Sequence, residues 1–294
     1  MNNSAEPDFE RLGTPYAILL ISINVCTSLV ACILNLLIIL TFVKSPSMRT
    51  PSFFLILCLA IADFGVGSLV QPVYCIELFA RMNEARELLS YAASFRLGST
   101  WVLVASSFLT ITAITIDRFL AIHLNLRYQE IVTTKRSCIV VVVIFIVSPF
   151  GIFAGLRGRF PVVKIIFASL IVILLLLNIF LMAKIFQNVS KHSANIRAQG
   201  KSVALQGSLS LSRYKKTVNT MYYIIGVFGV CYIPVASINI ALNISKLKLP
   251  FPIAFYLVHV PITLMLINSA LNPVIYCWRI QDMRNAVLHL FRKP

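Results

Sequence analysis

Seven long apolar runs constrain this chain more strongly than any other feature of its sequence. About 20 consecutive apolar residues let a helix cross the hydrocarbon core of a bilayer, and each run is long enough. The sequence therefore predicts an all-α protein, a seven-transmembrane helix bundle. The runs cover approximately residues 16–43, 52–79, 92–122, 137–156, 161–187, 216–243 and 252–278.

The charge pattern agrees with a membrane protein and predicts its orientation. Hydrophobic residues make up 59% of the chain and charged residues 12%, whereas soluble domains carry about 25% charged residues. The net charge of +16 comes from Lys and Arg concentrated in loops on one side, which is typical of the cytoplasmic side. We therefore expect an extracellular amino terminus and a cytoplasmic carboxyl terminus. No nucleic-acid-binding motif accompanies this charge, so we expect no nucleic-acid partner.

The segments outside the apolar runs are short. Residues 1–15 form a polar extracellular tail, in which Asn2 begins a glycosylation sequon. The seven-helix domain covers 16–278, and its longest loop, the third inner loop at about 188–212, is polar and rich in Ser. In residues 279–294, apolar side chains recur on one face at helical spacing, which predicts a short amphipathic helix on the membrane surface and a short cytoplasmic tail.

No group of residues resembles the active site of an enzyme. The sequence has no GxSxG or HExxH motif, and its four His residues lie in four different regions. Nucleophilic and metal-dependent hydrolases need such residues at defined spacings. We therefore expect that the protein is not an enzyme.

Asp63 lies in the middle of the second apolar run. A charged side chain near the centre of a bilayer costs about 2.5–3.5 kcal/mol on insertion scales, so its presence needs an explanation. Oxygen-bearing side chains of other runs could hold a hydrated monovalent cation beside it. Alternatively, Asp63 is protonated or is hydrogen-bonded across helices. Because buried acids also mark ion paths, an ion channel or transporter that uses Asp63 is the alternative class.

Four short motifs follow one another in the positions that this helix order requires. Asp117 and Arg118 stand side by side after twenty uncharged residues, where an isolated pair could also be a snorkelling interface pair. They begin the motif DRF; the others are LxxAxAD ending at Asp63, FGVCYIP at 228–234 and NPVIY at 272–276. Together the four motifs resemble class A (rhodopsin-like) G-protein-coupled receptors over nearly the whole chain.

This resemblance implies a multi-pass plasma-membrane receptor that converts extracellular ligand binding into activation of a heterotrimeric G protein. In the family, the Asp of an Asp-Arg-Tyr motif pairs with the Arg at rest, and activation frees the Arg. An acid that often pairs with this Arg from the sixth helix is replaced here by Tyr214, so we expect raised basal activity. The matching switch residues are Asp117, Arg118, Phe119, Phe228, Tyr232, Pro234, Asn272, Pro273 and Tyr276.

The resemblance also assigns a role to the polar residues inside the apolar runs. They match the allosteric sodium pocket of the family, and no other cofactor is implied. Its members here are Asp63, Ser107, Asn268, Ser269 and Asn272.

Several departures from the family pattern favour one branch of it. Ala93 stands where the family usually has a Cys at the top of the third helix, and the second outer loop has no Cys. Leu174 replaces the usual proline of the fifth helix. Melanocortin receptors share these absences, whereas NPVIYCWRIQDMR is closer to adenosine receptors. The chain is identified as a divergent relative of the melanocortin–adenosine–cannabinoid receptor group.

The ligand is constrained mainly by what the helices lack. Thr100 stands where amine receptors have an Asp, and the seventh helix has no Lys for retinal. The mostly apolar pocket and its basic rim favour a small lipophilic or anionic ligand, although rim cations are also ordinary surface. A melanocortin-like peptide is the alternative ligand, and His259 is explained at least as well as a hydrogen-bonded or lipid-interface histidine. The candidate pocket comprises Thr100, Trp101, Val104, Ile166, Phe167, Val235, Asn239 and His259.

The tail beyond Arg279 has no Ser or Thr. We therefore expect no recruitment of arrestin through phosphorylation of the tail. The third inner loop offers Ser208, Ser210 and Ser212 instead, where phosphates would add negative charge next to cations. The same segment is equally well explained as a polar linker.

Overall fold

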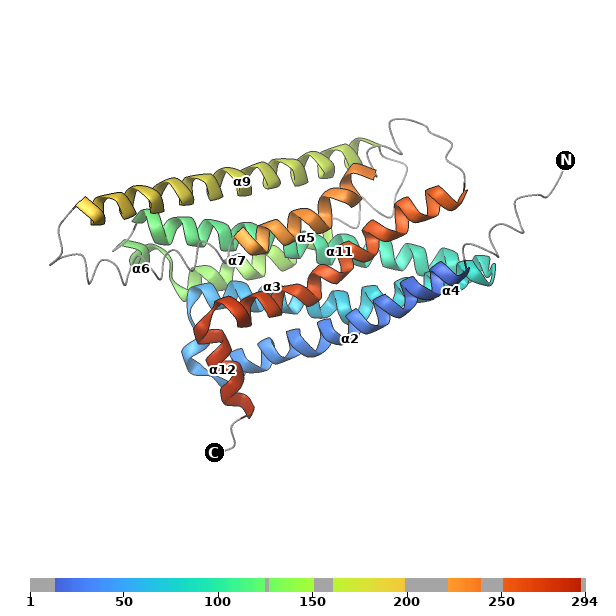
Figure 1. Ribbon diagram of the computed structural model, residues 1–294, viewed down its shortest axis with the longest axis horizontal. Coiled ribbons are helices and arrows are strands. Elements are labelled where there is room, and N and C mark those ends of the chain that lie inside the picture. Colours follow the sequence, from blue (N-terminus) through green and yellow to red (C-terminus); the bar gives the residue numbers. More distant parts are fainter. Residues whose placement is uncertain (1–13, 125–126, 151–160, 199–221, 239–250, 292–294) are drawn as a thin grey trace.

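The protein folds into a bundle of long helices that run beside one another (Figure 1). The computed structural model describes residues 14–124, 127–150, 161–198, 222–238 and 251–291, and no strand occurs within these ranges. The elements are α2 (Thr14–Lys44), η2 (Pro46–Met48), α3 (Pro51–Gly65), η3 (Val66–Val70), α4 (Gln71–Met82), α5 (Arg86–Leu124), α6 (Tyr128–Ile131), α7 (Thr134–Val147), η5 (Ser148–Phe150), α9 (Pro161–Ala198), the helix Tyr222–Ile238, α11 (Phe251–Arg279) and α12 (Gln281–Phe291).

The helices account for each of the seven predicted runs. Within the described residues, five spans are long and apolar enough to cross a membrane: α2, the continuous segment Pro51–Met82, α5, Val172–Lys191 of α9 and Phe255–Arg279 of α11. The helix Tyr222–Ile238 is apolar but shorter within the described residues. The fourth run corresponds to α7 followed by η5. The predicted all-α bundle is therefore the observed fold.

The second run contains an irregular turn that its hydropathy does not predict. Residues Val66–Val70 form a π-helical segment between α3 and α4. Pro72 follows after one residue, Gln71, and a proline ring inside a helix clashes with the carbonyl four residues earlier. A wider π turn relieves that clash by adding a residue to the turn.

Gly67 brings this irregular turn against the first helix. Ser28 Oγ donates to the Gly67 carbonyl oxygen at 2.7 Å. A Cβ at position 67 would lie 3.0 Å from Ala31 Cβ and 3.1 Å from Cys32 Sγ. Only glycine therefore allows this contact between α2 and η3 without displacement.

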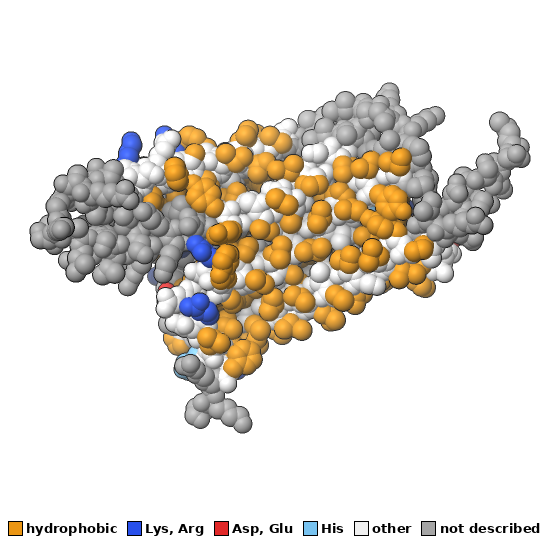
Figure 2. All heavy atoms as spheres, in the orientation of Figure 1, with side chains coloured by type: hydrophobic (Ala, Val, Ile, Leu, Met, Phe, Trp, Pro, Cys, Tyr) orange, Lys and Arg blue, Asp and Glu red, His pale blue; other side chains and the backbone are white. Residues whose placement is uncertain are grey.

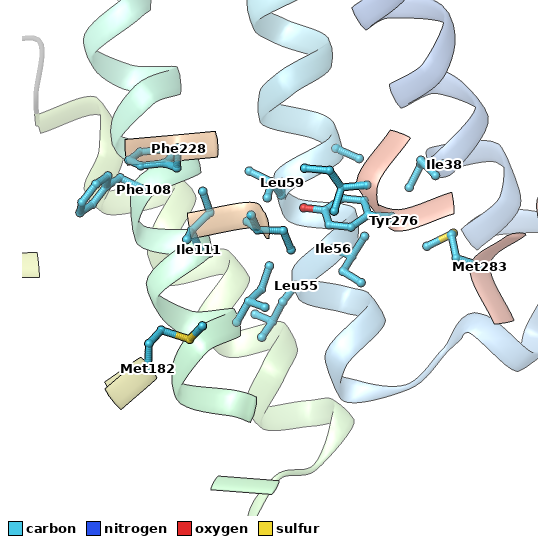
Figure 3. Packing of buried hydrophobic residues seen from close by; sticks show 14 of the residues in the cluster. Ile38, Leu55, Ile56, Leu59, Phe108, Ile111, Met182, Phe228, Tyr276 and Met283 are labelled. Atoms are coloured by element: carbon cyan, nitrogen blue, oxygen red, sulfur yellow. The ribbon is translucent and has the colours of Figure 1, made fainter. Parts of the chain in front are cut away.

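In the part of the chain that the structure describes, the buried apolar side chains form two clusters, one in each half of the bundle. Figure 3 shows the first, where α2, α3, α5, α9, the helix Tyr222–Ile238, α11 and α12 meet. Its residues include Ile38, Leu59, Phe108, Ile111, Met182, Phe228, Tyr276 and Met283. The second cluster, in the half near the start of α2, contains Leu20, Val70, Tyr74, Leu78, Phe255 and Leu266.

The outer surface carries the apolar side chains that face lipid. Figure 2 shows a broad hydrophobic band, with Lys and Arg side chains toward the end of the bundle that carries α12. α12 turns away from the axis of α11 at this end (Figure 1). It buries Met283 in the first cluster and leaves Leu288 and Phe291 exposed, as a helix lying in the interface does.

Candidate functional site

The carboxylate of Asp117 is the centre of a polar cluster at the end of the bundle where α6 lies (Figure 1). Arg118 Nη2 lies 2.7 Å from Asp117 Oδ2. Ser52 Oγ donates to the same oxygen at 2.9 Å, and the Tyr128 hydroxyl donates to Oδ1 at 2.7 Å. Asp117 is buried. Three elements, α3, α5 and α6, therefore meet at one carboxylate.

Tyr128 is held as a neutral donor in this cluster. Burial, followed by the negative charge of Asp117, raises the pKa of Tyr128 to about 12. Its hydroxyl therefore keeps its proton throughout the physiological pH range. Sequence reasoning missed both Ser52 and Tyr128, because neither is part of a motif and they come from different helices.

The sixth helix carries an aromatic stack next to α5. The rings of Phe228 and Tyr232 are stacked with centroids 3.8 Å apart and an interplanar angle of 13°. The ring of Phe108 on α5 lies 4.9 Å from that of Phe228. Pro234 follows within the same helix, where it removes a backbone donor. Tyr214 lies outside the described residues.

The residues around Asp63 form a buried polar core between α3, α5 and α11. Asn272 Nδ2 donates to Asp63 Oδ2 at 2.7 Å, and Ser107 and Ser269 also interact with this carboxylate. Asn35 Nδ2 donates to the Ser269 carbonyl oxygen at 3.0 Å. All five side chains are almost completely buried.

This core has oxygen atoms that lack a donor. Within the described part of the chain, Asp63 Oδ1 and Asn268 Oδ1 are buried without a hydrogen-bond partner. Leaving such a group unpaired costs about 1–3 kcal/mol. Carboxylate, amide and hydroxyl oxygens are the ligands that hard cations prefer. The residues present therefore fit a monovalent cation beside Asp63.

Two further switch residues of α11 are buried near this core. Pro273 is enclosed, and the hydroxyl of Tyr276 is buried without a hydrogen-bond partner among the described residues. The ring of Tyr276 packs in the first apolar cluster near Leu59 and Ile56 (Figure 3). Phe119 stacks on His123 at the end of α5, with ring centroids 5.4 Å apart.

The predicted ligand pocket is described only in part. Thr100, Trp101 and Val104 lie on α5, and Val235 lies on the sixth helix. Val104 and Val235 pack against the second apolar cluster. Asn239 and the side chains of Ile166 and Phe167 lie outside the described residues.

His259 of α11 is buried and hydrogen-bonded. Its Nδ1 lies 2.9 Å from the hydroxyl oxygen of Tyr74 on α4, and its ring lies 4.2 Å from that of Phe255. This geometry is that of a hydrogen-bonded histidine in the interior of the bundle.

Glu77 forms a second carboxylate cluster, at the opposite end of the bundle from Asp117 (Figure 1). It is 1% exposed, and Arg81 Nη2 lies 3.0 Å from its Oε1. Arg96 of α5 donates through Nε to the other oxygen, and its guanidinium lies 5.5 Å from the centre of the Tyr74 ring. Two cations therefore neutralise this acid. The sequence shows opposite charges near the tops of adjacent helices, but not that they pair.

The sequence model of the family described as "7 transmembrane receptor (rhodopsin family)" matches residues 34–158 and 156–276. The chain belongs to this family. The assignment agrees with the bundle, with the Asp117–Arg118 pair at the end of α5 and with the Asn272–Asp63 contact between α11 and α3.

Individual relatives within the rhodopsin family are similar over most of their length. Adenosine receptor A3 of Ovis aries is 23% identical, covering 92% of this chain and 89% of the relative. G-protein coupled receptor 12 of Homo sapiens is 27% identical, covering 97% and 83%. Melanocortin receptor 4 of Danio rerio is 28% identical, covering 92% and 83%. The predicted resemblance to adenosine and melanocortin receptors is therefore confirmed.

Membership of the rhodopsin family fixes the broad function. The protein is a multi-pass receptor of the plasma membrane that responds to an extracellular ligand and signals through a G protein. Its relatives are receptors rather than enzymes. The channel or transporter alternative is not favoured.

Proposed function

We propose that ligand binding opens the cytoplasmic end of the sixth helix and releases Arg118 from Asp117, so that Arg118 contacts a heterotrimeric G protein. One observation carries this proposal: the Asp117 carboxylate keeps two neutral donors, Ser52 and Tyr128, in addition to Arg118. The guanidinium can therefore leave without stranding a buried charge. An Arg stays protonated in either position.

Because Tyr214 cannot pair with Arg118 as an acid would, we propose that the receptor has raised basal activity. The test is ligand-free activation of a panel of Gα subtypes in cells, comparing wild type with Arg118→Ala at matched surface expression. We expect a basal signal that the substitution abolishes and that Tyr214→Glu reduces. A basal signal unchanged by both substitutions would contradict the mechanism.

We further propose that the polar core binds a sodium ion that favours the resting state. Asp63, Ser107, Asn268, Ser269 and Asn272 would hold the ion, which supplies the positive charge that compensates the buried carboxylate. Replacing choline by sodium at constant ionic strength should lower basal signalling in membranes. Asp63→Asn should remove this response, while the exposed Asp282→Asn should keep it. Sodium current that depends on Asp63 would instead support the channel alternative.

For the ligand, we propose a small lipophilic or anionic molecule. Apolar contacts of Val104 and Val235 support the lipophilic part, and the pairing of Glu77 with two arginines leaves no free acid there for a cationic peptide side chain. We expect fatty acids or lysophospholipids to raise the melting temperature of the purified receptor. Val104→Trp should block the shift and lipid-facing Val142→Trp should not. A shift only with melanocortin-type peptides would favour the peptide alternative.

We also propose an extracellular amino terminus and recruitment of arrestin through the third inner loop. With the amino terminus outside, Asn2 should carry a glycan that a glycosidase removes from intact cells and that Asn2→Gln prevents.

Phosphorylation of Ser208, Ser210 and Ser212 should recruit arrestin. Unchanged arrestin recruitment after replacing all three with Ala would exclude the loop as the docking segment.

A further inference from the structure

A cation lies beside two exposed aromatic rings where the helix Tyr222–Ile238 meets α11. The guanidinium of Arg279, the last residue of α11, lies 5.1 Å from the ring centre of Tyr223 and 5.1 Å from that of Trp278. The two rings lie 5.2 Å apart at 56° to one another. Tyr223 is 44% exposed and Trp278 is 60% exposed. The three side chains therefore form a surface group rather than part of the core.

The charge of Arg279 has no acidic partner among the described residues. The ion pairs found there involve Arg81, Arg96 and Arg118. Its Nε is buried without a hydrogen-bond partner in the same part of the chain. A guanidinium offers five donors in a planar fork that matches phosphate oxygens. Cation–π attraction to the rings uses no hydrogen-bond acceptor, so it leaves the N–H donors of the guanidinium for an anion.

The position of Arg279 along the bundle places it at the level of lipid headgroups. α11 ends at Arg279, and α12 begins two residues later and turns across the end of the bundle (Figure 1). The exposed Leu288 and Phe291 of α12 mark the boundary between lipid tails and headgroups. Trp and Tyr side chains prefer this same interfacial layer.

We propose that Arg279, Trp278 and Tyr223 form a binding site for the phosphate group of an anionic phospholipid of the inner leaflet. The guanidinium edge binds the phosphate, and the two rings hold the guanidinium and contact the glycerol and upper acyl region. The net charge of a phosphatidylglycerol or phosphatidylserine headgroup complements the unpaired cation, whereas the zwitterionic phosphatidylcholine carries its own cation to this site. The site is independent of how the receptor couples to a G protein.

The two tryptophans of the chain, Trp101 and Trp278, allow a direct test. In a Trp101→Phe background, Trp278 is the sole tryptophan and its fluorescence reports the lipid beside it. The receptor is placed in nanodiscs of phosphatidylcholine that contain a fixed fraction of phosphatidylglycerol. Bromine atoms, which quench tryptophan on contact, are carried by the tails of either the phosphatidylglycerol or an equal amount of phosphatidylcholine.

We expect brominated phosphatidylglycerol to be enriched at Trp278 about fivefold over brominated phosphatidylcholine, the ratio that one interfacial Arg supports. Arg279→Gln should bring the two lipids to equal quenching, and Arg279→Lys should leave a reduced preference. The matched control is Arg284→Gln, which removes an exposed cation from α12 and should keep the preference. Equal quenching by both lipids in the parent protein, or equal losses in the two Gln variants, would overturn the proposal.

Discussion

The two buried carboxylates at opposite ends of the bundle differ in how they are neutralised. Glu77 is held by two arginines, Arg81 and Arg96. Asp117 is held by one arginine and by two hydroxyl groups. A buried carboxylate that is held only by arginines loses part of its charge compensation when one arginine leaves. A carboxylate that also accepts hydrogen bonds from hydroxyl groups keeps those bonds when its arginine leaves. The Glu77 cluster is therefore a fixed tie between helices, whereas the Asp117 cluster can exchange its cation.

The largest effect on the free energy of unfolding is expected from removing the carboxylate of Glu77. Glu77→Gln would leave two arginines without a carboxylate, and losing one partner of a buried ion pair costs about 3–5 kcal/mol. Because Arg81 is partly exposed, we expect a loss at the lower end, about 3 kcal/mol, in the free energy of unfolding in detergent. Exposed Glu87→Gln is the control and should change little. A loss for Glu77→Gln no larger than for this control would refute the fixed tie.

A smaller loss in the free energy of unfolding is expected when the Asp117 carboxylate loses a hydrogen-bond donor. Tyr128→Phe removes a hydrogen bond to a charged group, which is worth about 1.5–3 kcal/mol. Since the pKa of Tyr128 is raised to about 12 in the folded protein, its contribution is fully present below the ordinary pKa of about 10 and is lost as the pH rises toward 12. The cost of Tyr128→Phe, measured by unfolding at several pH values, should therefore be constant from about pH 6 to about pH 9. A cost that varies in this range would mean that the hydroxyl does not donate to Asp117.

Ser52→Ala should have a more modest effect. The hydroxyl donates to Asp117 Oδ2, but Arg118 contacts the same oxygen, so the carboxylate keeps a partner there. We expect a loss of about 1 kcal/mol in the same unfolding measurement. Ser22→Ala, at a lipid-facing position where the hydroxyl bonds only its own helix, provides the baseline. If the two substitutions cost the same, Ser52 is not a significant donor to Asp117.

The smallest change in stability is expected for the residue most important to signalling. Arg118 is 23% exposed, and Asp117 keeps its two hydroxyl donors, so Arg118→Gln should cost less than about 1 kcal/mol. Arg96→Gln, which takes the better-buried cation from Glu77, should cost clearly more. Equal costs for the two substitutions, measured side by side, would remove the distinction between a fixed and an exchangeable cluster.

The hydropathy of the sequence predicted the helices better than their ends. α5 begins at Arg86, before the predicted start at residue 92, and α9 continues to Ala198, beyond residue 187. Polar helix-forming residues extend both helices past the bilayer, and hydropathy does not detect such extensions. The π segment Val66–Val70 was also missed, because a proline within an apolar run predicts disturbance but not its form.

For the candidate site, too, the sequence predicts one group of residues and misses another. Residues within motifs, such as Asp117, Arg118 and Asn272, could be assigned because their spacing along one helix is fixed. Their partners could not, since Ser52 lies far from Asp117 in sequence and Glu77 and Arg96 belong to different helices. Only the packing of helices determines such pairs, and a single sequence does not encode it in any local pattern.

The π turn at Val66–Val70 has a consequence for how this receptor can tolerate changes in length. One residue rotates a helix by about 100°, so the extra residue of the turn sets the direction in which all of α4 faces. Tyr74 and Glu77 are buried against α5 and α11 only in this setting. Deleting one residue from the turn would leave the span long enough to cross the bilayer, but would rotate Glu77 away from Arg96 and toward the lipid. The second helix would therefore lose its buried contacts through a change of one residue in its length, although its hydropathy would hardly change.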